Sequence, residues 1–119
     1  MFESKKLIES FRHAFRGLKY VFQWEQSLRV QILISLIVIF LMFYFPTRRL
    51  EKVALLLAIM GVLTLELINT IFERLSDVLK PRIHDYIKDI KDIMAATVLI
   101  ASLIALIIGI LILGPYIWR

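Results

Sequence analysis

The chain has 119 residues, of which 60% are apolar and 21% are charged, and its formal net charge is +5. Its mean hydropathy is +0.79. A soluble domain is only about 45–50% apolar even when glycine is counted, so this chain carries more apolar surface than a small soluble core can hide. The lack of polar low-complexity sequence excludes a disordered chain, and the lack of cysteine excludes a disulfide scaffold and thiolate metal sites. The composition predicts one integral membrane domain, residues 1–119.

Residues 1–27 are predicted to form an amphipathic helix that lies on the membrane surface. The segment carries several basic residues and has no continuous apolar core, which excludes a secretory signal peptide. Its apolar residues recur at helical spacing while the basic residues fall on other faces. A soluble helix that packs on a partner is the alternative. The apolar positions are Leu7, Ile8, Phe11, Phe15, Leu18 and Phe22.

Three apolar segments follow, and each is predicted to cross a membrane. Val30–Phe45 is uncharged and spans about 24 Å as a helix, close to the thickness of the hydrocarbon core once flanking arginines extend to the interface. Pro46 is expected to end this first helix. The second segment is interrupted by Glu66, and the third is uncharged from Ile93 to Trp118. The expected fold is an all-α membrane protein with one surface helix and transmembrane helices at 28–46, 51–73 and 93–118.

The distribution of basic residues predicts the orientation. Residues 1–29 hold six Lys or Arg and 74–92 hold five, against three in 46–52 and Arg119 at the end of the chain. The positive-inside rule places the N-terminus and the 74–92 connection in the cytoplasm and the C-terminus outside. This connection, interrupted by Pro81, is expected to be a turn or a short amphipathic helix.

A stripe of polar residues on the second membrane segment is the most informative feature. Glu66 and Glu73 are seven residues apart and differ by only about 20° around a helix axis. Asn69 and Thr70 lie between them on the same side, and Asp77 extends the line by one turn. Carboxylates in or beside a membrane are costly, so the stripe indicates a proton path, a metal or a phosphate-handling site. A polar seam that joins helices is the alternative.

Further charged residues are predicted to gather at the same end of the molecule. Glu25 directly precedes the first membrane helix, and Lys91 and Asp92 directly precede the third. Carboxylate and amide oxygens suit Mg²⁺, and metal-bridged phosphates with a lysine are what phosphoryl transfer requires. The four glycines form neither a P-loop nor a glycine-rich kinase loop, so the standard kinase classes are excluded.

The stripe also carries a resemblance. Glu66-Leu-Ile-Asn69-Thr70-Ile-Phe-Glu73-Arg-Leu-Ser-Asp77 has the form E-x-x-N-[ST]-x-x-E-x-x-x-D, the most characteristic segment of the small prokaryotic lipid kinases, the diacylglycerol kinase and undecaprenol kinase family. Lys91-Asp92 with the alanines that follow, and the segment from Phe15 to Arg29, resemble two further signatures of that family. The resemblance covers residues 10 to 117.

The resemblance implies roles for the matching residues. Glu66 would be the general base for the lipid hydroxyl, and Asn69 and Thr70 would help to bind this substrate. Glu25 and Glu73 would bind Mg²⁺, and Lys91 and Asn69 would contact the phosphates of ATP. The nucleotide site would also include Arg16, Gly17, Lys19, Asp77 and Asp92. The family is homotrimeric, with active sites shared between neighbouring subunits.

We therefore expect an ATP- and Mg²⁺-dependent lipid kinase of the bacterial cytoplasmic membrane. Its acceptor would be a membrane lipid alcohol, undecaprenol or diacylglycerol, and its product undecaprenyl phosphate or phosphatidic acid. No nucleic acid partner is expected. The alternative is a non-enzymatic membrane protein, such as an assembly factor or an ion or proton pathway, whose carboxylates form structural ion pairs.

Overall fold

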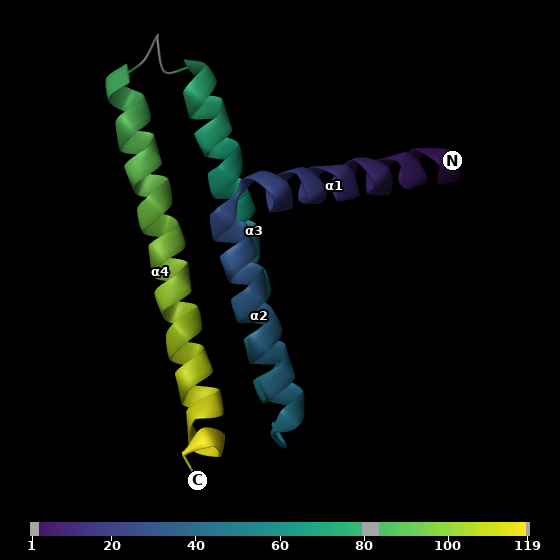
Figure 1. Cartoon of the computed structure of the whole chain (residues 1–119), viewed down its shortest axis with the longest axis vertical. Coiled ribbons are helices and arrows are strands. Elements are labelled where there is room, and N and C mark those ends of the chain that lie inside the picture. The colour runs from purple at the N-terminus through teal and green to yellow at the C-terminus, as the bar shows by residue number, and fades with distance from the viewer. Residues whose placement is uncertain (1–2, 80–83, 119) are drawn as a thin grey trace.

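The computed structural model describes residues 3–79 and 84–118, with side chains in the second range from Tyr86 onward. These residues form four helices, α1 (Ser4–Trp24), α2 (Gln26–Tyr44), α3 (Arg49–Leu79) and α4 (His84–Ile117). In Figure 1, α2, α3 and α4 run lengthwise through the molecule, and α1 projects sideways from them. The molecule measures 56 × 44 × 27 Å. The prediction of an all-helical fold is confirmed.

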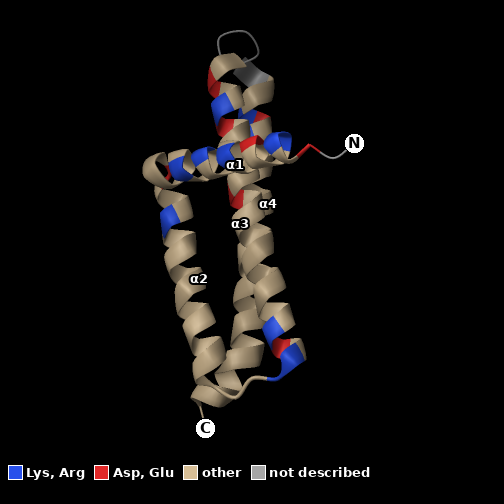
Figure 2. Ribbon diagram, turned by 90° about the vertical axis from the view of Figure 1, so that its right-hand side faces the viewer, with Lys and Arg blue, Asp and Glu red and all other residues tan. Residues whose placement is uncertain are grey.

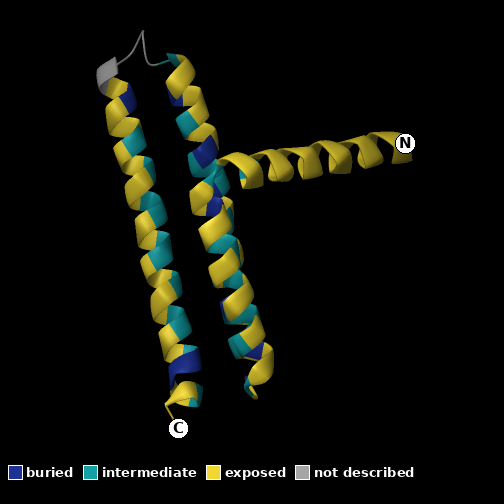
Figure 3. Ribbon diagram, viewed as in Figure 1, coloured by how far each residue is buried: buried dark blue, intermediate teal, exposed yellow. Residues whose placement is uncertain are grey.

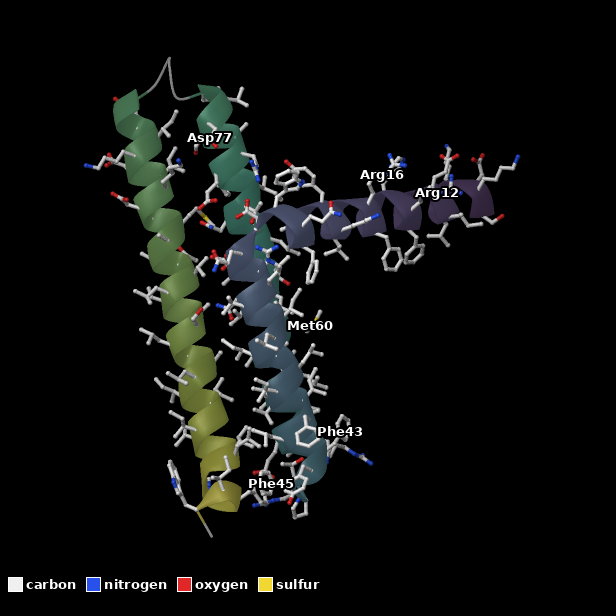
Figure 4. All side chains as sticks on the ribbon, in the orientation of Figure 1. Arg12, Arg16, Phe43, Phe45, Met60 and Asp77 are labelled. Carbon is white, nitrogen blue, oxygen red and sulfur yellow. The ribbon has the colours of Figure 1, made fainter. Side chains whose placement is uncertain are left out.

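Three of these helices are long and apolar enough to span a membrane, as the sequence predicted. Charged residues gather at the two ends of the lengthwise helices and are absent from a long middle section (Figure 2). The outward faces of the helices are exposed in this single chain (Figure 3). Phe43 and Met60, which are 69% and 60% exposed, point away from α4 (Figure 4). An uncharged middle section with exposed apolar side chains is the arrangement of a multi-pass membrane protein.

Helix α1 packs against the rest of the chain only at its C-terminal end. It contains no buried residue, and its phenylalanines and leucines are exposed. Arg12 and Arg16 both extend from the side of α1 that faces the α3–α4 end of the molecule (Figure 4). The predicted amphipathic helix is confirmed, and its place on the membrane surface remains a prediction.

The core where the three lengthwise helices meet is small and lies near the α2–α3 turn. Met42, Leu55 and Leu113 come from α2, α3 and α4 and are each at most 6% exposed. Helix α2 ends at Tyr44, directly before the turn that contains Pro46, and Thr47 closes the turn by donating a hydrogen bond from Oγ1 to the Met42 carbonyl oxygen (2.8 Å). A proline cannot donate the hydrogen bond that would continue the helix, which explains this boundary.

The segment 74–92, predicted to be a turn or a short amphipathic helix, is for the most part a continuation of two long helices. Helix α3 continues to Leu79 and α4 begins at His84, so most of that segment belongs to two helices that extend past their apolar sections. A helix need not end where its apolar residues end, because backbone hydrogen bonds continue through polar residues. The polar part of each helix still has a buried residue, Ser76 on α3 and Ile87 on α4. Pro81 lies outside the described residues.

Candidate active site

The polar stripe of α3 lies where α1 meets the lengthwise helices. Figure 2 shows charged residues of α3 and α4 at this level and beyond it, toward the α3–α4 connection. Because α3 is an unbroken helix from Arg49 to Leu79, its apolar section and its polar stripe form one rigid element. The stripe therefore holds a fixed position relative to the membrane-spanning part of the chain.

Glu66 is the most deeply placed acid of the stripe. It is 6% exposed, and its neighbour Thr70 is 4% exposed. The Thr70 hydroxyl donates to the Glu66 carbonyl oxygen (3.1 Å), so it bonds to the backbone and leaves the carboxylate alone. Within 3–79 and 84–118, no hydrogen bond or ion pair engages that carboxylate. A buried acid without a cation is costly, which argues against a merely structural ion pair at this position.

Glu73 and Glu25 are the charged neighbours of Glu66, since both carboxylates lie near enough to repel its charge. The side-chain amide of Asn69 donates to Oε1 of Glu73 (3.2 Å) and fixes that carboxylate on the helix surface. We call Glu25, Glu66 and Glu73 the acidic cluster. The predicted convergence of these acids is therefore seen within one chain.

Glu25 reaches the cluster from the junction of two helices. It lies between the end of α1 and the start of α2 in an extended conformation, with φ −114° and ψ 108°. Its Oε1 atom pairs with Nη2 of Arg74 at 3.0 Å. No role for Arg74 was predicted from the sequence. Its place within the motif, between Glu73 and Asp77, is the one sequence signal that points to it.

Lys91 and Asp77 form a cross-helix pair that closes the polar end of the α3–α4 packing. Lys91 Nζ lies 3.4 Å from Asp77 Oδ1, with both side chains substantially exposed. Asp92, the next residue, is exposed and makes no hydrogen bond to another described side chain. The predicted grouping of Lys91 with Asp77 is thus found.

Arg16, Gly17 and Lys19 are not brought into contact with the acidic cluster. All three are exposed on α1. No hydrogen bond or ion pair links Arg16 or Lys19 to an acid anywhere in the described chain. Their assignment to a nucleotide site remains a prediction.

An apolar cavity of about 530 Å³ lies between α2, α3 and α4 on the membrane side of the cluster. Val62, which lines its α3 side, is one helical turn before Glu66, and both residues are buried. The small residues Ala105 and Gly109 line its α4 side. The buried face of α3 therefore passes directly from apolar lining to the acid.

The acids present suit a metal shared with a ligand, rather than one enclosed by protein. No group of three acidic or histidine side chains in the described ranges lies close enough to hold an ion alone. Mg²⁺ is usually held by one or two carboxylates together with substrate phosphates and water. Glu25 and Glu73 fit that pattern, because both are half-buried and both lie near Glu66.

A second polar group lies at the opposite end of the bundle and was missed by sequence reasoning. The Tyr116 hydroxyl donates to Glu51 Oε1 (2.7 Å), and the backbone N–H of Arg48 donates to the same oxygen (2.8 Å). The ring of Tyr116 also stacks on Phe45, with the centroids 5.9 Å apart. These contacts tie the start of α3 to the end of α4, which is a structural role.

Three apolar helices with a cluster of acids at one end define a multi-pass membrane protein with a polar site at one membrane face. Residues 12–113 match the family model described as prokaryotic diacylglycerol kinase, and the chain belongs to that family. The resemblance seen in the Glu66–Asp77 motif is confirmed.

Curated relatives agree with this assignment. An undecaprenol kinase from Bacillus subtilis (strain 168) is 30% identical over 113 residues, which cover 95% of this chain and 92% of the relative. A diacylglycerol kinase from Haemophilus influenzae is 31% identical over 95 residues, 80% of each chain. A diacylglycerol kinase from Synechocystis sp. is 31% identical over 104 residues, and the chain spans only 59% of that relative's length.

Proposed function

We propose that this protein transfers the γ-phosphoryl group of ATP to the hydroxyl of a membrane lipid alcohol, with Mg²⁺ held by Glu25 and Glu73. Membership of the prokaryotic diacylglycerol kinase family makes the chain a lipid kinase, with ATP as co-substrate. The observation that carries the site assignment is Glu66, a buried acid that no described residue pairs with, at the boundary between the apolar cavity and the polar end of α3.

The chemistry assigned to Glu66 is proton removal. The lipid approaches from the bilayer, and its hydroxyl meets the Glu66 carboxylate. As the hydroxyl oxygen bonds to the γ-phosphorus, the bond from that phosphorus to the β,γ-bridging oxygen breaks and ADP leaves. The proton passes to Glu66, which has no cation to compete for its carboxylate among the described residues.

The remaining residues bind and orient the nucleotide. When bound, Mg²⁺ supplies charge neutralisation at the phosphates. Asn69 holds Glu73 through its 3.2 Å hydrogen bond, and Lys91 adds a cation at the polar edge of the site, placed by Asp77. Arg16, Gly17 and Lys19 approach the nucleotide from α1, with Asp92 beside Lys91, and Thr70 lies with Asn69 on the lipid side of the site.

The setting is a bacterial cytoplasmic membrane, with α1 and the α3–α4 connection in the cytoplasm and the C-terminus outside. The excess of basic residues near α1 and that connection supports this orientation. A homotrimer supports function best, because one chain leaves the outer faces of its polar site uncovered, with Asp77 61% exposed. Neighbouring subunits would exclude lipid from these polar groups.

The test is transfer of radiolabel from γ-labelled ATP in mixed micelles that contain either undecaprenol or diacylglycerol. Purified protein is expected to label one or both lipids in the presence of Mg²⁺ and neither after chelation with EDTA. The variant Glu73→Gln is expected to lose most of its activity at the Mg²⁺ concentration that gives half-maximal rate in the wild type. A chain that labels neither lipid, or whose rate is indifferent to EDTA, contradicts the proposal. The ratio of the two rates identifies the acceptor, with undecaprenol expected because the B. subtilis relative is covered almost completely.

A further inference from the structure

Arg74 connects α3 with the end of α1 and the α1–α2 junction, which both lie far from it in sequence. It lies on α3 directly after Glu73. Its guanidinium pairs with Glu25, 49 positions earlier, at 3.0 Å. The same group lies over the ring of Tyr20 on α1, with 5.7 Å from Cζ to the ring centroid. One side chain of α3, the helix that carries the acidic stripe, thus contacts both α1 and the α1–α2 junction.

Glu25 is the member of the acidic cluster whose position needs such support. Glu66 and Glu73 lie within the long helix α3, which fixes their backbone. Glu25 instead is the single extended residue between α1 and α2. No side-chain hydrogen bond caps the start of α2. The contact from Arg29 Nη1 to the Gln23 carbonyl oxygen (3.3 Å) crosses the junction without touching the Glu25 side chain. The ion pair with Arg74 is what ties this carboxylate to α3.

The pairing leaves Glu25 able to bind a ligand. Arg74 engages Oε1, and nothing among the described residues engages Oε2. The Glu25 side chain is 21% exposed, so Oε2 is open to an approaching cation. Arg29, the cation at the junction, donates to the Gln23 carbonyl oxygen, and Lys91 is paired with Asp77. Arg74 is therefore the described cation in contact with the acidic cluster, and it lowers the repulsion between Glu25 and its acidic neighbours.

We propose that Arg74 is a positioning residue that holds Glu25 beside Glu73 and fixes the end of α1 there, so that both carboxylates are preorganised for a Mg²⁺–nucleotide complex. The inference rests on the proposed function of Glu25 and Glu73. Arginine suits this role because its planar guanidinium can pair with a carboxylate through its edge while its face lies on an aromatic ring. Lysine can keep the charge but loses the combined geometry.

The experiment compares Arg74→Ala and Arg74→Lys with Arg49→Ala, which removes an exposed arginine from the other end of α3. The measurement is the Mg²⁺ concentration that gives half-maximal lipid phosphorylation at saturating lipid. Arg74→Ala is expected to raise it at least about tenfold, Arg74→Lys by less, and Arg49→Ala not at all. A rise in Mg²⁺ requirement larger than the loss in maximal rate separates positioning of a metal ligand from general damage.

A second readout is independent of activity. Trp24 lies 6.5 Å from Tyr20 between ring centroids, and Trp118 is the only other tryptophan. In a Trp118→Phe background, quenching of Trp24 by lipids brominated at different depths reports where the end of α1 lies. Arg74→Ala is expected to change the quenching profile, and Arg49→Ala to leave it unchanged.

The outcomes distinguish the two proposals. A wild-type protein that phosphorylates no lipid overturns the proposed function, while the Trp24 profile still tests the contact. An active wild type whose Mg²⁺ requirement is unchanged in Arg74→Ala overturns the role of Arg74. An Arg74→Ala protein that loses maximal rate at an unchanged Mg²⁺ requirement also overturns it.

Discussion

Replacing Glu66 with glutamine is expected to remove activity and to stabilise the protein at the same time. Glutamine has the shape of glutamate, and the Thr70 hydroxyl bonds to the backbone carbonyl of residue 66, so this contact survives the substitution. What changes is the charge of a side chain that is 6% exposed and that no described cation accompanies. The substitution therefore separates the chemical use of the charge from its structural cost.

The two effects have different magnitudes. Loss of a general base typically costs 10²–10⁴ in rate, so kcat should fall by at least about 100-fold, equivalent to about 2.7 kcal/mol of barrier. A charge at the centre of a membrane helix costs about 2.5–3.5 kcal/mol on insertion scales. Glu66 lies toward the polar end of its helix, so we expect a smaller gain of about 1 kcal/mol in the free energy of unfolding from removing its charge.

The assay pairs initial rates at saturating ATP and lipid with unfolding in SDS followed by circular dichroism. Glu51→Gln is the matched control: it removes a carboxylate from the same helix at the opposite end and keeps an oxygen for Tyr116 and Arg48. This control should keep nearly full activity. A Glu66→Gln protein that retains more than a tenth of the wild-type rate, or that unfolds more easily than wild type, would refute the reasoning.

Three further predictions follow from the described contacts. Glu73→Gln should raise the Mg²⁺ concentration for half-maximal rate at least about tenfold, measured by titration at fixed ATP, because it removes one proposed ligand charge. Lys91→Ala should raise the KM for ATP or lower kcat at least about tenfold, whereas Lys88→Ala on the same helix should do neither. Leu55→Ala should lower the free energy of unfolding by about 2 kcal/mol in SDS titrations, because it empties a fully buried position, whereas Leu57→Ala, 67% exposed, should change it little.

Each of these has an outcome that contradicts it. An unchanged Mg²⁺ requirement in Glu73→Gln removes this residue from the metal site. Near-wild-type kinetics in Lys91→Ala would reduce the pair with Asp77 to a structural contact. Equal effects at Leu55 and Leu57 would mean that the three-helix core near the α2–α3 turn does not determine stability.

The sequence predicts the membrane part of this fold well, because segment length and charge are strong local signals. Val30–Phe45 and Ile93–Trp118 must be helical to satisfy their backbone groups in lipid, and the helices found there agree. The prediction of a turn or a short amphipathic helix over 74–92 differs from the structure because the first charges do not end either long helix. The backbone hydrogen bonds of both helices continue there, because each helix still packs one side against its neighbour, with Ser76 and Ile87 buried.

The candidate site likewise has one part that the sequence predicts and one part that it does not. Residues on one helix, such as Glu66, Asn69 and Glu73, are placed by the helical repeat alone, and their grouping follows from their spacing. The contact of Arg74 with Glu25 depends on the angle at which α1 leaves the bundle and on the packing of α2 against α3. No local pattern encodes either quantity, so this contact follows only from the three-dimensional fold.

The single unbroken helix α3 explains how one small chain can bring a water-soluble and a lipid reactant together. Its buried face changes from the cavity residue Val62 to the acid Glu66 within one turn, about 6 Å along the axis. Glu73 follows two turns later at the polar end. Since a helix is stiff over this length, the proposed base and the proposed metal ligand keep a fixed separation as lipids rearrange around them. Glu25, on a junction, lacks that stiffness, and the ion pair with Arg74 supplies the missing constraint.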